Sequence, residues 1–380
     1  MLIPNNVQKT KMFQYAGASR FAYNWALARE IENYEKGGKF ISDAELRKEF
    51  TKLRHSDEYA WLLSISNNVT KQAIKDACTA YKNFFKGLQK FPRFKSKKRS
   101  MPKFYQDNVK IRFSNTHVKF EGFSSSRKAN KQKMNWVRLA EHGSIPTDAK
   151  YMNPRISFDG LNWWISVCVE FPDCRETLND DGVGIDLGIK DLAICSDGTK
   201  YKNINKSQKV KKLEKQKRRL QRSISRSYEK NKKGESYCKT NNVIKKEKLL
   251  LKRNHRLTNI RKNYLNQTIS EIVNRKPRFI CIEDLNVSGM MKNRHLSKAV
   301  QEQGFFWFRK QLEYKCSDKG IQLIVADRFY PSSKLCSCCG NIKKDLKLSD
   351  RVYRCECGNM IDRDFQASIN LKTYGEKFAS

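Results

Sequence analysis

The chain has 380 residues, 39% of them hydrophobic, which is enough for two or three domains with buried cores. Its 77 Lys and Arg against 39 Asp and Glu give a formal charge of +38. This excess is far larger than solubility requires, so we expect a polyanionic partner, and nucleic acid is the first choice. No apolar run approaches the roughly 20 residues that span a bilayer, and no signal-peptide core stands at the amino terminus. We therefore expect no membrane partner and a cytoplasmic location.

Two amphipathic helices are predicted near the amino terminus, at residues 13–30 and 67–85. The second begins behind a capping cluster at Ser66 and turns one polar face outward. Asn, Gln and Lys on one helical face are the side chains that read a DNA groove, although most such faces are only solvated. Both interpretations stay open for four residues of this face: Asn68, Lys71, Gln72 and Lys75.

A basic loop with interleaved aromatics, FPRFKSKKRSMPKF, starts at Phe91. Phosphate contact with base stacking, with Arg93 and Lys95 as candidates, is the functional interpretation, and a flexible linker is the alternative. Beyond the loop the hydrophobic period becomes two, which predicts a small, mostly antiparallel β domain. A polar run at 172–181 predicts its boundary. The expected strands lie at 109–113, 118–123, 134–139, 155–158 and 163–171.

The most basic part of the chain is residues 206–262, with 22 Lys and Arg against 4 Glu. Apolar residues recur there at spacings of three, four and seven, which predicts two long helices joined by residues 231–242. Such a hairpin is packed along one seam only. Charge runs are usually solvated faces, but this density along a thin helical pair favours a nucleic-acid contact.

Residues 182–198, GVGIDLGIKDLAICSDG, predict two buried strands folded back on each other. Asp186 lies inside the first apolar run. Burying its carboxylate without a partner would cost several kcal/mol, so a metal ion, a cationic partner or a water-filled cleft has to face it. The alternative is an Asp that caps a turn at a strand end, and only other acids in the chain decide against it.

A second buried strand is predicted at 279–285, followed by an amphipathic helix at 296–316 and another buried strand at 321–326. Strands separated by long helical crossovers predict an α/β sheet. The strand at 279–285 again ends in acid, at Glu283, which is the companion that Asp186 requires.

A third acid, Asp362 or Asp364, opens a helix near the carboxyl end. An RNase H-like sheet gathers carboxylates from distant sequence positions in this way. Together with Asp186 and Glu283, such a set can hold two Mg²⁺ roughly 3.5–4 Å apart. One ion would activate water and the other would stabilise the leaving oxygen of a phosphodiester.

Five of the twelve cysteines crowd into two short runs, Cys336-Ser-Cys338-Cys339-Gly340 and Cys355-Glu-Cys357-Gly358. Two such pairs predict structural Zn²⁺, because four thiolates at about 2.3 Å satisfy its tetrahedral geometry and leave no open position. A glycine directly after a pair permits the left-handed backbone of a knuckle, which leaves Cys338 spare. The other seven cysteines are scattered singly, as suits a reducing compartment. The predicted zinc ligands are Cys336, Cys339, Cys355 and Cys357.

Several motifs together resemble the TnpB family of insertion-sequence proteins, RNA-guided nucleases related to type V CRISPR effectors. The most specific are GIDLGIKDLAICSDG, FICIEDLN and the cysteine pairs that run into IDRDFQASINL. Three motifs nearer the amino terminus, RFAYNWAL, AYKNFFKG and FPRFKSKK, also fit the family. The resemblance therefore covers nearly the whole chain. It implies an α/β, RNase H-like (RuvC-like) nuclease domain at 181–331 and 361–380, which includes a basic hairpin at 206–275. A zinc ribbon is inserted at 332–360. A helical recognition domain occupies 13–90, and a small β-barrel-like wedge domain occupies 1–12 and 91–180, with a shortened opening strand.

The resemblance also assigns the nuclease residues. Asp186 matches the first acid of the family and Glu283 the second, and the third motif selects Asp364 because its acid directly precedes an aromatic or aliphatic residue. Two departures stand beside these matches: Gln366 replaces the usual Asn, and the second cysteine pair is Cys-x-Cys rather than Cys-x-x-Cys. The implied cofactors are two Mg²⁺ and structural Zn²⁺. The implied partners are a guide RNA from the transposon end and target double-stranded DNA, in the nucleoid of a prokaryote.

The implied function is RNA-guided cleavage of double-stranded DNA beside a short target-adjacent motif, by two-metal hydrolysis. Lys71 and Gln72 are the foremost candidates for reading that motif. Two alternatives stay open: a guided DNA-binding regulator that no longer cuts, and a direct cut-and-paste transposase. The intact acids disfavour the first, and the order Asp, Glu, Asp disfavours the second, because the usual transposase order closes on Glu.

Overall fold

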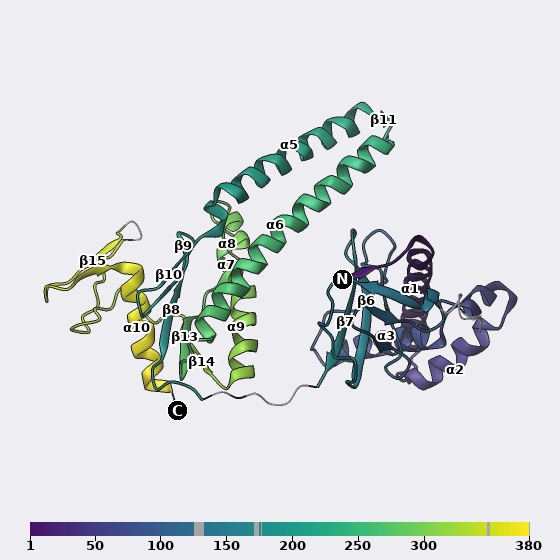
Figure 1. The fold of residues 1–380 in the computed structure, drawn as a ribbon, viewed down its shortest axis with the longest axis horizontal. Coiled ribbons are helices and arrows are strands. Elements are labelled where there is room, and N and C mark those ends of the chain that lie inside the picture. The colour runs from purple at the N-terminus through teal and green to yellow at the C-terminus, as the bar shows by residue number, and fades with distance from the viewer. Residues whose placement is uncertain (125–132, 171–174, 176, 348–349, 380) are drawn as a thin grey trace. The chain divides into compact units, whose positions relative to one another are not determined.

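The computed structural model describes residues 1–124, 133–170, 175, 177–347 and 350–379. It divides into two compact units, Met1–Phe171 and Pro172–Ser380. Figure 1 shows that each unit combines helices with a β-sheet, so the expected mixed α/β architecture is confirmed. Within the described ranges, no helix is both long and apolar enough to cross a membrane.

The first unit opens with a short strand, β1 (Leu2–Ile3), and a long helix, α1 (Asn6–Glu35). The helix begins seven residues before its predicted start, because Asn5 and Gln8 form a capping box. Each of these two side chains accepts a hydrogen bond of 2.9 Å from the other residue's backbone N–H. Most of the segment 1–12, which was expected to belong to a β domain, is therefore helical. Among the described residues, α1 is followed by α2 (Asp43–Arg54), the 3-10 helix η1 (Asp57–Ser64) and α3 (Asn67–Phe85). The bounds of α3 are those predicted.

An antiparallel sheet of seven strands, in the order β2-β6-β7-β1-β5-β4-β3, completes the first unit. Tyr15 of α1 contacts the rings of Phe104 and Phe123 from the sheet side, and helices and sheet share one buried core. The strands after β1 are β2 (Lys103–Tyr105), β3 (Arg112–Phe113), β4 (His117–Lys119), β5 (Trp136–Leu139), β6 (Tyr151–Phe158) and β7 (Trp163–Val169), with a 3-10 turn η2 (Lys133–Asn135) before β5.

Some predicted strands of this sheet are too long. The strand expected at 109–113 keeps only its last two residues, because the Asp107 carboxylate accepts hydrogen bonds from the backbone N–H of Val109 and of Lys110, at 3.0 and 3.1 Å. This side-chain-capped turn competes with strand pairing. The strand expected at 118–123 ends at Lys119. Residue 171, the predicted end of the last strand, lies outside the described ranges.

The second unit is built on a sheet of five strands in the order β10-β9-β8-β13-β14. Strand β8 is parallel to β13, and β13 is parallel to β14, whereas β9 is antiparallel to both of its neighbours, β8 and β10. The pair predicted at 182–198 and the strands predicted at 279–285 and 321–326 are all present. Their bounds are β8 (Val183–Leu187), β9 (Asp191–Cys195), β10 (Lys200–Lys202), β13 (Phe279–Glu283) and β14 (Gln322–Ala326).

Helices cover both faces of this sheet, with α10 (Arg363–Phe378) on one face and α6 (Asn241–Val273) and α9 (Phe305–Lys319) on the other (Figure 1). Ile185 and Ile282 belong to the core with α6 and α9, while Cys281 packs on the α10 side. Because side chains alternate along a strand, Asp186 and Glu283 point toward the α10 face.

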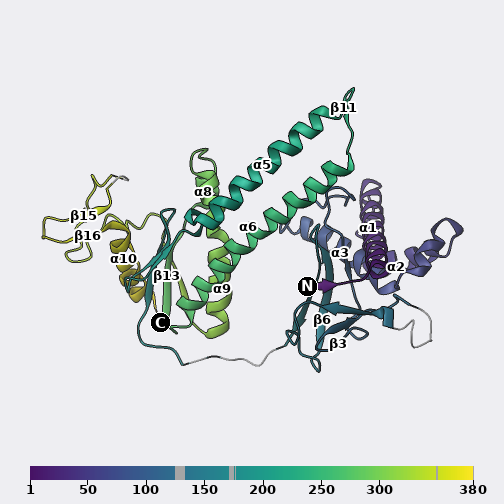
Figure 2. The same cartoon turned by 45° about the horizontal axis from the view of Figure 1, so that its top comes forward.

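The basic hairpin consists of α5 (Gln208–Lys230) and α6, preceded by the 3-10 turn η3 (Ile204–Lys206). Figures 1 and 2 both show it projecting from the sheet of its own unit. Its packing is the predicted single seam, in which Val210, Leu213 and Leu257 are buried. The tip carries two short strands, β11 (Lys232–Lys233) and β12 (Ser236–Tyr237).

The helix predicted at 296–316 is in fact two helices, α8 (Ser297–Gln303) and α9, separated by Gly304. Gly304 has a φ of 71°, a left-handed conformation that ends a helix and that glycine adopts without strain. The remaining elements are α7 (Val287–Met290) and the two strands of the cysteine-bearing segment, β15 (Val352–Arg354) and β16 (Met360–Asp362).

Candidate functional site

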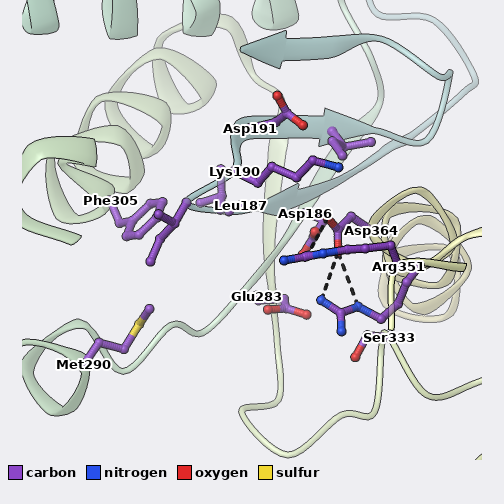
Figure 3. Close-up of a pocket in the computed structure, with 14 residues that line it drawn as sticks. Asp186, Leu187, Lys190, Asp191, Glu283, Met290, Phe305, Ser333, Arg351 and Asp364 are labelled. Carbon is purple, nitrogen blue, oxygen red and sulfur yellow. Dashed lines mark hydrogen bonds and ion pairs between the residues drawn. The ribbon is translucent and has the colours of Figure 1, made fainter. Parts of the chain in front are cut away.

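Three acids predicted from the sequence line one cavity of about 350 Å³ in the second unit. Asp186 comes from β8, Glu283 ends β13, and Asp364 lies in the first turn of α10. Figure 3 shows their carboxylates directed toward a common space. The structure thus brings together side chains from widely separated parts of the chain.

The close approach of α10 to β8 makes this meeting possible. A Cβ placed on Gly184 would overlap the backbone carbonyl oxygen of Ser368 and the backbone nitrogen of Lys372. Only glycine therefore lets the helix lie this near the strand. Asp186 is two residues further along the same face of β8, so the contact at Gly184 helps to place Asp186 beside the start of α10.

The electrostatics of the cavity are those of acids held close together. Burial raises the pKa of Asp186 well above its ordinary value, and the neighbouring Glu283 and Asp364 raise it further. Burial also raises the pKa of Glu283, against a hydrogen bond that the Ser332 hydroxyl donates to its carboxylate. Negative charge is costly here unless a cation enters, and an all-oxygen set of carboxylates suits the hard cation Mg²⁺.

Asp362 and Asp364 have different roles in the structure. The Asp362 side chain is the N-cap of α10, accepting hydrogen bonds of 3.1 Å from the backbone N–H of Asp364 and of Phe365. The Asp364 carboxylate instead lines the cavity, where it pairs with Arg363 at 3.3 Å and with Arg351 at 3.8 Å. Asp364 is therefore the better placed of the two to bind a metal.

Three cations also line the cavity, and the sequence alone did not single them out: Lys190, Arg351 and Arg363. Arg351, which Figure 3 shows beside Asp364, pairs with that acid, as does its sequence neighbour Arg363. Positive groups beside a set of carboxylates suit a phosphodiester, whose oxygens they can contact. In the sequence, Arg363 could have been recognised as a residue of this cavity because it directly precedes Asp364, the acid of the third motif.

The predicted four cysteines form the second cluster of this unit. The sulfur atoms of Cys336, Cys339, Cys355 and Cys357 all lie within 4.8 Å of one another, while Cys338 is exposed and outside the group. The Cys336–Cys357 and Cys339–Cys355 sulfur distances are 3.7 and 3.5 Å. Sulfurs bound at about 2.3 Å to a tetrahedral ion lie roughly 3.8 Å apart, so the arrangement fits Zn²⁺. Gly340 and Gly358 have the predicted left-handed backbone, with φ of 72° and 90°.

Buried polar side chains of α10 connect the two clusters. Gln366 donates a hydrogen bond of 2.9 Å to the backbone carbonyl of Leu335, directly before the first cysteine, and accepts one of 2.9 Å from Asn359, two residues after the last. Asn370, one turn later, donates to the carbonyls of Ser332 and Leu335, both at 2.7 Å. The longer Gln366 side chain is therefore fully engaged in holding the cysteine-bearing segment to the helix.

In the first unit, the four predicted nucleic-acid contacts of α3 fall into two pairs: two are hydrogen-bonded within the protein and two are exposed. Gln72 donates a hydrogen bond of 2.9 Å to Asp76, which is also paired with Arg155, and Asn68 donates one of 3.1 Å to Glu121. These two amides are engaged within the protein. Lys71 and Lys75 are exposed on the same face and can still contact phosphate.

The two candidate residues of the basic loop also differ in their exposure to solvent. Arg93 is exposed, but Lys95 is partly buried, and its Nζ lies over the Tyr23 ring at 3.0 Å. Burial and the nearby Lys103 lower the pKa of Lys95 to about 7. The following residues line a cavity of about 910 Å³ along α1, which the sequence did not predict and which includes Arg20, Lys97, Lys98 and Arg99.

A second basic cavity, of about 600 Å³, lies at the base of the hairpin between α5 and α8. Its cations are Lys211, Lys215, Arg218, Arg219, Arg222 and Lys298. Five of these six cations belong to α5, and Glu214 and Glu302 lie beside them, so the hairpin presents part of its charge on an accessible surface where it can contact phosphates.

Comparison with protein families gives three matches. The OrfB_IS605 model, described as "Probable transposase", matches residues 166–294. A model described as "Cas12f1-like, TNB domain" matches residues 305–371, which include the cysteine cluster and Asp364. A "Helix-turn-helix domain" model matches residues 1–39, where the structure has β1 and the single helix α1.

Individual relatives match over nearly the full chain. One is a candidate RNA-guided DNA endonuclease of Escherichia coli (strain K12), InsQ, which is 30% identical over 93% of this chain and 86% of its own length. Another, from Streptomyces pristinaespiralis and similarly named, is 29% identical over 98% of this chain and 87% of its own. Among solved structures, a chain of a Cas12f1–sgRNA–target DNA complex has a TM-score of 0.58 at 13% identity, covering 95% of this chain and 81% of that one. This last likeness concerns the fold.

Proposed function

The chain belongs to the TnpB family of insertion-sequence proteins and is an RNA-guided DNA endonuclease, and we propose that it cuts double-stranded DNA beside a short target-adjacent motif. The observation that carries the cleavage chemistry is the cavity in which Asp186, Glu283 and Asp364 converge. We propose that these three acids hold two Mg²⁺ and that the sheet bearing them is a RuvC-like nuclease domain.

The three predicted acids and the cations of the cavity have different parts in this proposal. Mg²⁺ bound by the acids would lower the pKa of an attacking water and offset charge on the leaving oxygen. Asp186 and Glu283, fixed on adjacent parallel strands, set the spacing of two carboxylates, and Asp364 closes the set from the helix. Lys190 and the more exposed Arg351 are placed to hold non-bridging phosphate oxygens and so to orient the scissile phosphodiester, whereas the guanidinium of Arg363 is engaged with Asp364.

The four-cysteine cluster is proposed to hold structural Zn²⁺ as a ribbon at 332–360. Four thiolates fill the tetrahedral coordination, so the ion would fold the segment and take no part in cleavage. We also propose that residues 13–90 form a helical recognition domain and that residues 1–12 and 91–180 form a β wedge domain. The buried residues of the two domains share one core in the first unit.

Specificity is proposed to come from a guide RNA encoded at the transposon end. The charged surfaces of both units supply phosphate contacts, which position a nucleic acid without reading its sequence. Base pairing between the guide RNA and one strand of the target DNA supplies the sequence specificity, as in other guided nucleases. Such a complex acts where the DNA is, in the prokaryotic nucleoid.

Cleavage of a plasmid library by the purified protein with its copurifying RNA tests this function. We expect Mg²⁺-dependent cuts beside one short motif, and cuts that move when the guide portion of the RNA is exchanged. Bound but uncut targets would indicate the silent regulator. Cleavage of the same sites by RNA-free protein would indicate a direct transposase.

A further inference from the structure

A short loop between β14 and the first cysteine contacts one of the three acids. Ser332, in this loop, is only 4% exposed, and its hydroxyl donates a hydrogen bond to Oε1 of Glu283. The backbone of β13 directs the Cβ of Glu283 toward the α10 face, but it does not fix the torsions of the long side chain and so does not place the carboxylate. The bond to Ser332 limits rotation of the carboxylate.

Ser332 is in turn held by helix α10. The Asn370 side chain, 2% exposed, donates to the backbone carbonyl of Ser332 at 2.7 Å and to that of Leu335 at 2.7 Å. On the other side of the loop, the Tyr330 hydroxyl donates to the backbone carbonyl of Asn370 at 3.1 Å. The loop is therefore fixed to the helix on both sides of Ser332.

The same helix carries Asp364 in its first turn. Asn370 is six residues further along, which is about 9 Å at 1.5 Å per residue. One rigid helix therefore places Asp364 directly and Glu283 through Asn370 and Ser332. This arrangement couples the spacing of two acids that come from different elements.

We propose that Ser332 is a positioning residue for the nuclease reaction, orienting Glu283 for metal binding, and that Asn370 positions Ser332. The inference rests on the proposed function, because it assumes that Glu283 binds a metal. Hydrogen-bond partners of metal-binding side chains are worth about 10- to 100-fold in metal affinity or activity. Ser332 contacts neither the phosphodiester nor the metal in this role.

The test uses the full chain with its copurifying RNA and Mn²⁺ as the probe, detected by electron paramagnetic resonance. The fraction of binding lost in Asp186→Ala defines the cavity site. For Ser332→Ala we expect its affinity for Mn²⁺ to fall about 10-fold or more, and the Mg²⁺ concentration for half-maximal cleavage to rise by a similar factor. Ser332→Thr keeps the hydroxyl and should restore both, whereas Asn370→Ala should weaken both.

Ser368→Ala is the matched control. Ser368 is a fully buried serine of α10. Its hydroxyl donates a hydrogen bond of 2.7 Å to the backbone carbonyl of Phe365 rather than to an acid. It should leave Mn²⁺ affinity unchanged. Wild-type Mn²⁺ affinity in Ser332→Ala would overturn the positioning role and leave the nuclease intact. Equal Mn²⁺ binding by wild type and Asp186→Ala would overturn the metal site itself, and this inference with it.

Discussion

The acid cavity and the cysteine cluster lie in the same unit, yet they are assembled in opposite ways. The four cysteines come from two short turns, so their sulfurs meet through local backbone geometry. The acids come from two strands and a helix between residue 186 and residue 364, and they meet only when the sheet and α10 have packed. A local cluster can be inferred from spacing, whereas a distant one requires the fold.

The two regions also differ in what holds them in the absence of a metal. The Glu283 carboxylate accepts a hydrogen bond from Ser332, and Asp364 pairs with two arginines, so two of the three acids have protein partners. The sulfurs of the cysteine cluster lie mainly against one another. We therefore expect loss of metal to disturb the cysteine-bearing segment far more than the sheet.

The largest expected effect is loss of cleavage when an acid is removed. Asp186→Ala, Glu283→Ala and Asp364→Ala should each reduce the cleavage rate by roughly 10³-fold or more, because charge stabilisation in the transition state is lost. Binding of guide RNA and DNA should be nearly unchanged, since the basic surfaces are intact. Cleavage and filter-binding assays of the purified variants measure both. Full cleavage by Asp364→Ala would refute its assignment.

The second effect concerns the cysteine cluster alone. Cys339→Ser should lose zinc and lower the thermal stability of the segment, because it removes one of four thiolates. Cys338→Ser is the control, since that exposed side chain lies outside the cluster and should change neither quantity. Metal analysis by mass spectrometry decides between them. Equal zinc loss in both variants would show that the ligand set is wrong.

The contrast between these regions also explains which features the sequence predicts. Strands β8 and β13 were predictable because continuous apolar runs end in conspicuous acids, and α3, α5 and α6 because their apolar stripes are long. The early start of α1 depends on a capping box, and the break at Gly304 on one left-handed residue. Such local hydrogen bonds and single dihedral angles leave little trace in hydrophobic periodicity.

The site was predictable to the same extent. Acids at the ends of apolar strands identified Asp186 and Glu283, the family resemblance selected Asp364 over Asp362, and glycine positions favoured four of the five clustered cysteines. Ser332 and Arg351 were missed because each reaches the acids only through a loop whose path depends on packing against α10. The engagement of Asn68 and Gln72 with neighbouring carboxylates was equally invisible, because those partners are set by tertiary structure.

The third prediction concerns the close steric contact between α10 and β8, which affects the acid cavity and not the cysteine cluster. Gly184→Ala would place a Cβ against the backbone of Ser368 and Lys372, so α10 must shift away from β8. We expect a loss of about 1–3 kcal/mol in unfolding free energy, as for other overpacked cores, together with slower cleavage because Asp364 moves with the helix. Denaturant unfolding and cleavage rates measure these changes. Gly198→Ala is a control for glycine substitution away from α10. Its turn is open, but its φ of 85° is left-handed, so this variant should lose some stability through backbone strain and still cleave at the wild-type rate.

The smallest effect is expected at Asp362, the residue that joins the two regions. It ends β16 of the cysteine-bearing segment and is also the N-cap of α10, with its carboxylate bonded to two backbone N–H groups. Asp362→Ala should cost about 1 kcal/mol of unfolding free energy, the usual value of an N-cap, and should slow cleavage only slightly.

Asp362→Asn distinguishes a cap from a metal ligand, because Asn caps a helix about as well as Asp but supplies no negative charge. We expect it to restore both the melting temperature and the cleavage rate. If Asp362→Asn instead abolishes cleavage while the protein stays as stable as wild type, Asp362 contributes its charge to the metal site. The third acid would then have to be reassigned, since the position that the structure gives to a cap would be serving the reaction.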